Sequence, residues 1–151
     1  MRIKVLARSF FEARCGTARE AILFRRYRVI SINNISLPAE SPPFSSRFLS
    51  VSNLLILFFD DVEEGFPHAM TLKDAERIVR FILLPDFRPL LIHCTAGISR
   101  SGAAGAALNW YFNRTCLGEF LAFTHDNPDI SPNRHVYELL RQQLAFLQNS
   151  F

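Results

Sequence analysis

The stretch of sequence that decides the fold is Leu90–Ser101, which reads LLIHCTAGISRS. It begins with Leu90–Ile92, a short apolar run typical of a buried strand, and the Ala-rich segment Gly102–Phe112 that follows it favours a helix. A loop between a strand and a helix N-terminus can bind an oxyanion through its unpaired backbone N–H groups and the positive end of the helix dipole. Gly97 permits close approach of the backbone to such a ligand. The segment therefore predicts a phosphate-binding loop.

Three side chains of this loop carry chemistry. The positive potential at a helix N-terminus favours a thiolate, so we expect Cys94 to have a lowered pKa and to be a nucleophile at neutral pH. Arg100 offers a planar fork of donors that can hold two phosphate oxygens through a transition state. Ser101 places a hydroxyl near the sulfur. A lone cysteine after an apolar strand is more often a small buried hydrophobe, but Gly97, Arg100 and Ser101 at these offsets make that the weaker interpretation.

His93–Ser101 resembles the signature of the cysteine-dependent protein tyrosine phosphatase superfamily, in which His-Cys is followed after five residues by Arg-Ser. The small, uncharged loop with Ile98–Ser99 is most similar to the dual-specificity branch, particularly the MAP kinase phosphatases. This resemblance implies a phosphocysteine intermediate, no metal and no cofactor. It implies that Ser101 stabilises the Cys94 thiolate as it leaves in the second step. The phosphate-binding residues that it implies are Thr95, Ala96, Gly97, Ile98, Ser99 and Arg100.

Phosphoryl transfer to sulfur also needs an acid that protonates the departing oxygen. Asp60 and Asp61 end the expected strand Leu54–Phe59, and a parallel sheet presents its ligands at the carboxyl ends of its strands. Adjacent residues there point to opposite sides, so only one of the pair is expected to face the site. The resemblance selects Asp61, which lies 33 residues before Cys94, because the acid of dual-specificity phosphatases lies at a similar distance before the nucleophile. The competing interpretation is that both form a turn beside Glu63–Gly65.

Two further residues are candidates for a supporting role. Ile130–Asn133 resembles the dual-specificity pattern in which an Asn hydrogen-bonds near the catalytic loop, so Asn133 is expected to help hold that loop. A polar residue at a helix start that prefers water is nearly as good an interpretation, since Ser131 and Pro132 fit the N-cap and first position of a last helix. We expect His93 to be a structural histidine that tunes the surroundings of Cys94 rather than a base.

Outside the loop, short apolar runs alternate with amphipathic segments. Thr17 and Thr71 each precede an acidic residue three positions on, a pattern typical of a capping box at a helix start. The alternation predicts an α/β fold with a central, mostly parallel sheet flanked by helices. The resemblance implies that this is the layered architecture of protein tyrosine phosphatases. Strands are expected at 3–7, 29–32, 54–59 and 90–93, and helices after Thr17 and Thr71, at 102–112 and after Ser131.

Composition bounds the class of protein. With 151 residues, 49% hydrophobic content and fifteen Phe, the chain is expected to form a single catalytic domain over 1–151. A net charge of +3 without a dense basic run does not indicate nucleic acid binding, and the cluster of Arg25, Arg26 and Arg28 is interpreted as a solvated helix end. No apolar run reaches the roughly 18 residues of a membrane span.

Cysteine usage favours a reducing compartment. The chain has three cysteines and no Cys-x-x-Cys pair, which fits the cytoplasm. No spacing assigns Cys15 or Cys116 a role in resolving an oxidised Cys94. We expect a cytoplasmic monomer whose partner is a phosphorylated protein or a small phosphomonoester, not nucleic acid or a membrane.

The leading functional hypothesis is a phosphatase for phosphotyrosine, and also for phosphoserine and phosphothreonine, in proteins. The neutral side chains of Thr95, Ala96, Ile98 and Ser99 favour phosphoprotein, because phosphoinositide phosphatases often carry a basic residue in this loop. A binding module that keeps the phosphate loop but turns over slowly is the alternative, because the acid is the least secure member of the site. A sulfurtransferase is the weakest hypothesis, because its loop resembles a tighter cradle.

Overall fold

Four parallel strands form the sheet in the computed structural model, which describes residues 1–14, 17–36 and 52–148. Every neighbouring pair of these strands runs parallel, in the order β1-β4-β2-β3. The expected α/β fold is thus confirmed, and the four expected strands are present. The strands are β1 (Ile3–Ala7), β2 (Arg28–Asn33), β3 (Leu54–Phe58) and β4 (Leu90–Cys94).

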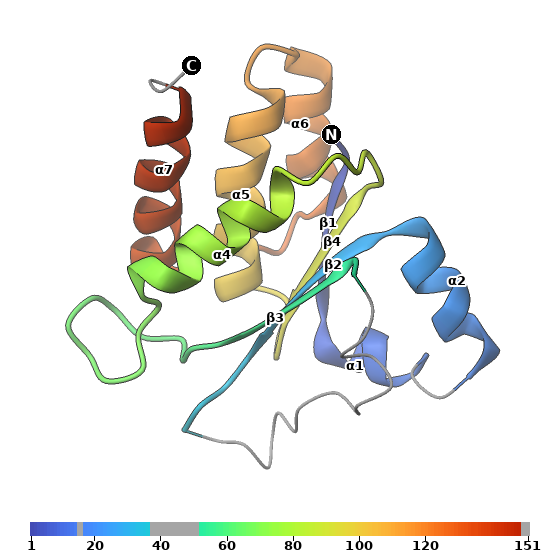
Figure 1. Ribbon diagram of the computed structural model, residues 1–151, viewed down its shortest axis with the longest axis horizontal. Helices are drawn as coiled ribbons and strands as arrows, with labels where there is room; N and C mark the ends of the chain where they lie inside the picture. The colour runs from blue at the N-terminus through green and yellow to red at the C-terminus, as the bar shows by residue number, and fades with distance from the viewer. Residues whose placement is uncertain (15–16, 37–51, 149–151) are drawn as a thin grey trace.

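Helices cover both faces of the sheet (Figure 1). One face carries α1 (Arg8–Glu12) and α2 (Ala18–Arg26). The other face carries the remaining described helices, which are α4 (Leu72–Ile82), α5 (Arg100–Asn113), α6 (Leu117–Asp126) and α7 (Arg134–Gln148). The short helix α1 and the helix α6 were not expected from the sequence. None of the described helices is both long and apolar enough to cross a membrane.

Strand β4 is buried on both faces, as a central parallel strand should be. Leu90, Ile92 and Cys94 belong to the core under α4–α7, whereas Leu91 belongs to the smaller core under α1 and α2. This alternation follows from the two-residue period of a strand. It fixes the rotation of β4 and places the Cys94 side chain toward α5.

Two of the three predicted helix caps are confirmed. Thr71 caps α4 in a full capping box with Asp74, and Thr17 caps α2 by accepting a hydrogen bond from the Arg19 N–H, without the reciprocal bond of a box. The expected start of the last helix at Ser131 is wrong. Helix α7 begins at Arg134, and the Asn133 Oδ1 caps it by accepting from the Val136 N–H at 3.0 Å.

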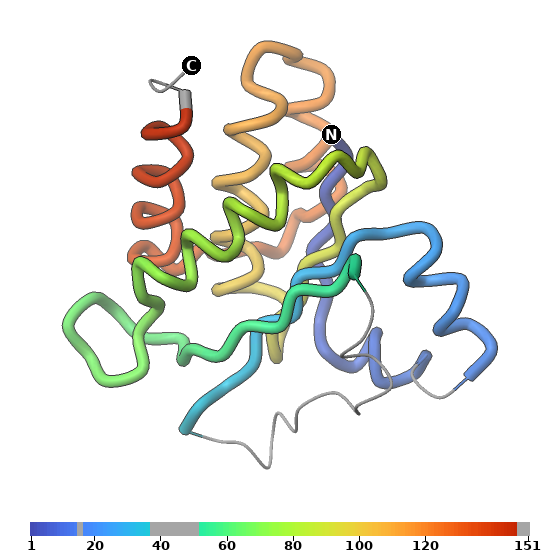
Figure 2. Tube along the Cα trace, in the orientation of Figure 1, coloured from blue at the N-terminus to red at the C-terminus, as the bar shows by residue number. Residues whose placement is uncertain are grey.

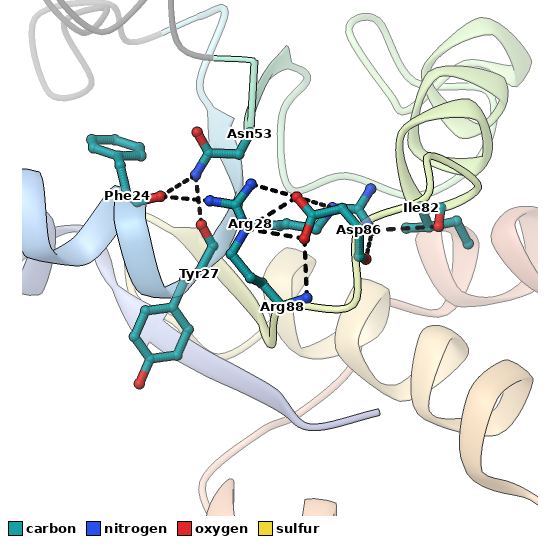
Figure 3. A network of polar contacts seen from close by, with 7 residues as sticks. All are labelled: Phe24, Tyr27, Arg28, Asn53, Ile82, Asp86 and Arg88. Carbon is teal, nitrogen blue, oxygen red and sulfur yellow. Dashed lines mark hydrogen bonds and ion pairs between the residues drawn. The ribbon is translucent and has the colours of Figure 1, made fainter.

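A buried arginine lies at the opposite end of the sheet from Cys94. Arg28, interpreted from the sequence as solvated, is only 1% exposed. Its Nη1 donates to the carbonyl oxygens of Asp86 at 3.1 Å and Ile82 at 3.4 Å (Figure 3). Its guanidinium lies over the Phe81 ring. The aliphatic part of the Arg28 side chain can lie in the core because the Ile82 and Asp86 carbonyls and the Asp86 carboxylate lie close to its guanidinium.

The carboxyl ends of the strands place the candidate site. Ala7 of β1 lies in register beside Cys94 of β4, and β3 runs parallel to its neighbour β2, so Asp60 and Asp61 follow β3 at the same edge. The trace turns back sharply there between β4 and α5 (Figure 2). Cys15 lies outside the described residues, and Cys116 is exposed just before α6.

Candidate active site

The loop between β4 and α5 is held from outside by its carbonyl groups. The Thr95 carbonyl accepts from the Arg8 N–H at 3.2 Å, and the Ile98 carbonyl accepts from the Ser131 N–H at 3.1 Å. The N–H groups of Ala96, Ile98 and Ser99 donate no hydrogen bond to the described part of the chain. Donors left unpaired at a helix N-terminus are suited to an oxyanion.

Gly97 gives the loop its shape. Its φ of +74° lies in the left-handed region that side chains disfavour. A Cβ on this residue would lie 2.4 Å from the backbone N of Ala7 and 2.4 Å from the carbonyl carbon of Leu6. The loop can therefore fold against the end of β1 only with glycine here.

Cys94 is buried, at 2% exposure, yet its surroundings favour the thiolate. Burial raises the pKa of the thiol, but hydrogen bonds from the Ser101 hydroxyl and from the backbone of Ser101 and Gly97, with the charge of Arg100, outweigh it and leave the pKa below the ordinary value. The Cys94 Sγ lies 3.0 Å from the Ser101 Oγ. The arrangement can supply a nucleophilic sulfur at neutral pH.

Arg100 reaches into the same site from the first turn of α5. Its Nη1 donates to the Phe59 carbonyl at 2.8 Å and its Nη2 donates to the Thr95 Oγ1 at 3.2 Å. The side chain is 3% exposed, and its Nε has no hydrogen-bond partner among the described residues. A buried guanidinium with an unused donor has capacity for a further acceptor, such as a phosphate oxygen.

The two aspartates after β3 have separate surroundings. The Asp60 carboxylate accepts from the backbone N–H groups of Ile35 and Ser36 and from the Ser36 hydroxyl. Burial opposes ionisation of Asp60, but these hydrogen bonds outweigh it and leave the pKa of Asp60 below its ordinary value. Asp61 instead accepts from the Ser99 hydroxyl at 2.8 Å. The structure thus brings Asp61 to the loop, whereas the Asp60 carboxylate is bound to the segment after β2.

Asn133 joins three parts of the site. Its Nδ2 donates to the Asp61 Oδ1 at 2.9 Å and the Val62 carbonyl at 3.3 Å. Its backbone N–H donates to the Ser99 carbonyl at 3.3 Å, while its Oδ1 caps α7. Asn133 therefore connects the segment that carries Asp61, the loop and the last helix through its side chain and its backbone.

His93 lies behind the loop, fully buried, with its ring 4.2 Å from the Phe11 ring. Burial, with smaller contributions from the charges of Arg8 and Arg100, lowers the pKa of His93 to about 3. The imidazole is therefore neutral at physiological pH.

A pocket of about 450 Å³ opens over these groups. Cys94 and Arg100 contribute to its lining, and so do both aspartates. Arg100 is the only basic residue that lines it within the described chain. The full lining is Asn34, Ser36, Asp60, Asp61, Val62, Cys94, Thr95, Ala96, Ser99 and Arg100.

Sequence reasoning missed the residues that follow β1 and β2. Arg8, 6% exposed, donates to the Asn33 Oδ1 at 2.6 Å and to the Glu12 Oε1 at 2.6 Å, and its N–H holds Thr95. Asn34 and Ser36 line the pocket. The available signal was their position, because polar residues directly after parallel strands gather at one edge of the sheet.

This architecture is that of the protein tyrosine phosphatase-like proteins. Comparison with solved structures finds the fold in phosphatases of this class and in a phosphatase-like protein, over most of the chain. The fold predicted from the resemblance is confirmed. No protein-family model matches the chain, and no curated protein matches it in sequence.

Three structures illustrate the likeness. The human tyrosine phosphatase-like serine/threonine/tyrosine-interacting protein is 19% identical, with a TM-score of 0.57 over 87% of this chain and 86% of its own. The PTP-2 phosphatase of Cydia pomonella is 18% identical, with a TM-score of 0.60 over 94% and 85%. PTPMT1 in complex with PI(5)P is 18% identical, with a TM-score of 0.59 over 99% and 94%. At these identities the likeness establishes the fold.

Proposed function

We propose that this chain is a cysteine-dependent phosphatase that hydrolyses phosphomonoesters through a phosphocysteine intermediate. The observation that carries the proposal is the pairing of Cys94 and Arg100 in one pocket: a thiol with a lowered pKa beside a buried guanidinium with an unused donor. A nucleophile, an oxyanion-binding loop and a nearby carboxylate are the groups that phosphoryl transfer to sulfur requires.

In the first step the Cys94 thiolate attacks phosphorus, the S–P bond forms and the bond to the departing oxygen breaks. Arg100 and the free N–H groups of the loop stabilise the transferring phosphoryl group. Asp61 donates a proton to the departing oxygen. Asp60 is the poorer donor because its hydrogen bonds keep it ionised.

In the second step water attacks the phosphocysteine. Asp61, now ionised, accepts a proton from that water, and the Cys94 thiolate leaves phosphorus. The Ser101 hydroxyl, 3.0 Å from the sulfur, stabilises the leaving thiolate by a hydrogen bond. Inorganic phosphate then departs and the thiolate is restored.

The substrate that fits the pocket best is a residue with a single phosphate. The lining includes one arginine and two aspartates, so the charge balance favours a phosphomonoester over a headgroup with several phosphates. We propose phosphotyrosine in proteins, with phosphoserine and phosphothreonine as further substrates. PTPMT1 has been solved with PI(5)P, which makes that lipid the sharpest competing substrate to test. A single catalytic domain over 1–151, monomeric and cytoplasmic, completes the proposal.

The test is phosphate release from para-nitrophenyl phosphate, a phosphotyrosine peptide and PI(5)P, with a metal chelator present. We expect turnover of the first two, loss of all turnover in Cys94→Ser, and a reduction of about a hundredfold or more in Asp61→Asn. Cys116→Ser and Asp60→Asn are the matched controls, and both should be much less affected.

Two results would redirect the proposal. Full turnover by Cys94→Ser would contradict the thiol mechanism, and faster release from PI(5)P than from the peptide would contradict the substrate assignment. Absence of turnover by the wild-type protein, with retained binding of the phosphotyrosine peptide, would favour the binding module instead.

A further inference from the structure

Ser99 occupies the N-cap position of α5 but does not cap it. Serine is favoured at an N-cap because its hydroxyl accepts a hydrogen bond from an N–H of the first turn. In α5 no such bond is present. The Ser99 hydroxyl instead donates to the Asp61 Oδ1 at 2.8 Å, across 38 positions of sequence. The Ser99 hydroxyl thus binds the Asp61 carboxylate and not the first turn of the helix.

Asp61 receives a second hydrogen bond on the same oxygen. The Asn133 Nδ2 donates to the Oδ1 at 2.9 Å, and the Asn133 N–H holds the Ser99 carbonyl at 3.3 Å. Ser99, Asp61 and Asn133 therefore form a closed ring of hydrogen bonds. Two donors from different elements fix both the position and the rotation of the carboxylate.

The ring leaves the other oxygen of the carboxylate available. The Asp61 Oδ2 accepts no hydrogen bond from the described residues, and Asp61 lines the pocket above Cys94. A carboxyl group held by one oxygen can carry its proton on the other and present it to a departing group.

We propose that the Ser99 side chain is a positioning residue for the general acid rather than part of the phosphate cradle. This inference rests on the proposed function, in which Asp61 is that acid. Ser99 binds phosphate only through its backbone N–H, while its hydroxyl aligns Asp61 with the departing oxygen. Proton donation matters most when the leaving group is a poor one. Loss of the Ser99 hydroxyl should therefore slow substrates with poor leaving groups more than substrates with good ones.

The experiment compares two aryl phosphates of different leaving-group quality. Phenyl phosphate, whose phenolate leaves poorly, depends strongly on the acid, and para-nitrophenyl phosphate depends on it less. We expect Ser99→Ala to lower kcat/KM for phenyl phosphate by about tenfold and for para-nitrophenyl phosphate by about threefold or less. Ser99→Thr, which keeps a hydroxyl, should restore much of the loss.

Two comparisons separate this role from a structural one. In an Asp61→Asn background, Ser99→Ala should add almost nothing, because both changes remove the same function. Thr95→Val removes the loop hydroxyl that contacts Arg100, so it should slow both substrates alike. Thermal unfolding of each variant shows whether it is folded.

The possible outcomes test the positioning role of Ser99 separately from the proposed phosphatase activity. An active wild-type enzyme whose Ser99→Ala variant slows both substrates equally, or slows Asp61→Asn further by the same factor, would overturn the positioning role alone. No turnover by the wild-type enzyme would overturn the proposed function, and the positioning role with it. A selective loss that vanishes in the Asp61→Asn background supports both.

Discussion

Cys94 is buried beside a hydroxyl, two backbone N–H groups and a guanidinium, and these together offset the cost of burying a thiolate. The Ser101 hydroxyl is the nearest side-chain donor, at 3.0 Å from the sulfur. Of the groups around the sulfur, it can be removed with the least change to the loop, because Ser101 lies within the first turn of α5.

We therefore predict that Ser101→Ala raises the pKa of Cys94. The rate of alkylation by iodoacetamide follows the thiolate, so its midpoint along the pH axis should lie below the ordinary 9.0 in the wild type and move upward in the variant. The Cys94→Ser variant serves as the control for reaction at other cysteines. An unchanged midpoint would show that the hydroxyl does not stabilise the thiolate.

Gly97→Ala should be damaging although it adds only one methyl group. The new Cβ would lie 2.4 Å from the Ala7 N, at a residue whose φ is +74°. We expect a loss of about 2 kcal/mol or more in the free energy of unfolding, with loss of activity, measured by urea denaturation. Gly65→Ala is the matched control, because it shares a positive φ but has no atom within 4 Å of the new Cβ. Equal losses at both positions would show that backbone strain alone, and not packing against β1, explains the effect.

The start of α7 depends on Asn133, which caps the helix and reaches Asp61 at the same time. We predict that Asn133→Ala lowers the free energy of unfolding by about 1–3 kcal/mol and also slows turnover. Ser131→Ala is the matched control, because the exposed Ser131 side chain makes no hydrogen bond in the described structure. Urea unfolding measures both losses. A larger loss of unfolding free energy in Ser131→Ala than in Asn133→Ala would show that Ser131, not Asn133, caps the helix.

Arg28, the first residue of β2, lies close to the Asp86 carboxylate at the end of the sheet opposite Cys94. Asp86 contacts Arg88 and lies 4.0 Å from the buried Arg28, and the hydrogen bonds from Arg88 lower the pKa of Asp86 to about 2 (Figure 3). Because folding lowers this pKa below its ordinary 3.8, the interaction stabilises the fold above about pH 4 and is lost as the pH falls through about 2.

Asp86→Asn should therefore reduce stability by about 1–2 kcal/mol at neutral pH, and the difference from wild type should shrink between pH 4 and pH 2. The measurement is urea unfolding across that range. Asp126→Asn removes a pair with the 75% exposed Arg2 and should change little at any pH. A difference that persists unchanged at pH 2 would contradict the role of the Asp86 charge.

Across the whole molecule, the sequence predicted best what local pattern determines. Apolar runs gave the four strands, and the loop around Cys94 and Arg100 lies where its strand-to-helix pattern requires. Helix α1 was missed because five residues are too few to show a helical period. The capping residue of α7 was misplaced because Ser-Pro is an equally good local start.

Contacts between distant segments could not be predicted from local pattern. Asn133 and Asp61 are 72 positions apart, and only the completed fold shows that they share a hydrogen bond. The burial of Arg28 likewise depends on the Ile82 and Asp86 carbonyls, more than 50 positions away. The resemblance to dual-specificity phosphatases named Asp61 and Asn133, but not the ring that joins them through Ser99.

The most direct test of the account is to trap the covalent intermediate. The wild-type enzyme is mixed with para-nitrophenyl phosphate, quenched in acid within the first turnovers and digested for mass spectrometry. We predict one phosphoryl group on the peptide that contains Cys94, formed with a burst of para-nitrophenol and absent in Cys94→Ser. Sustained turnover with no phosphorylated Cys94, or with the phosphoryl group on another residue, would contradict the account.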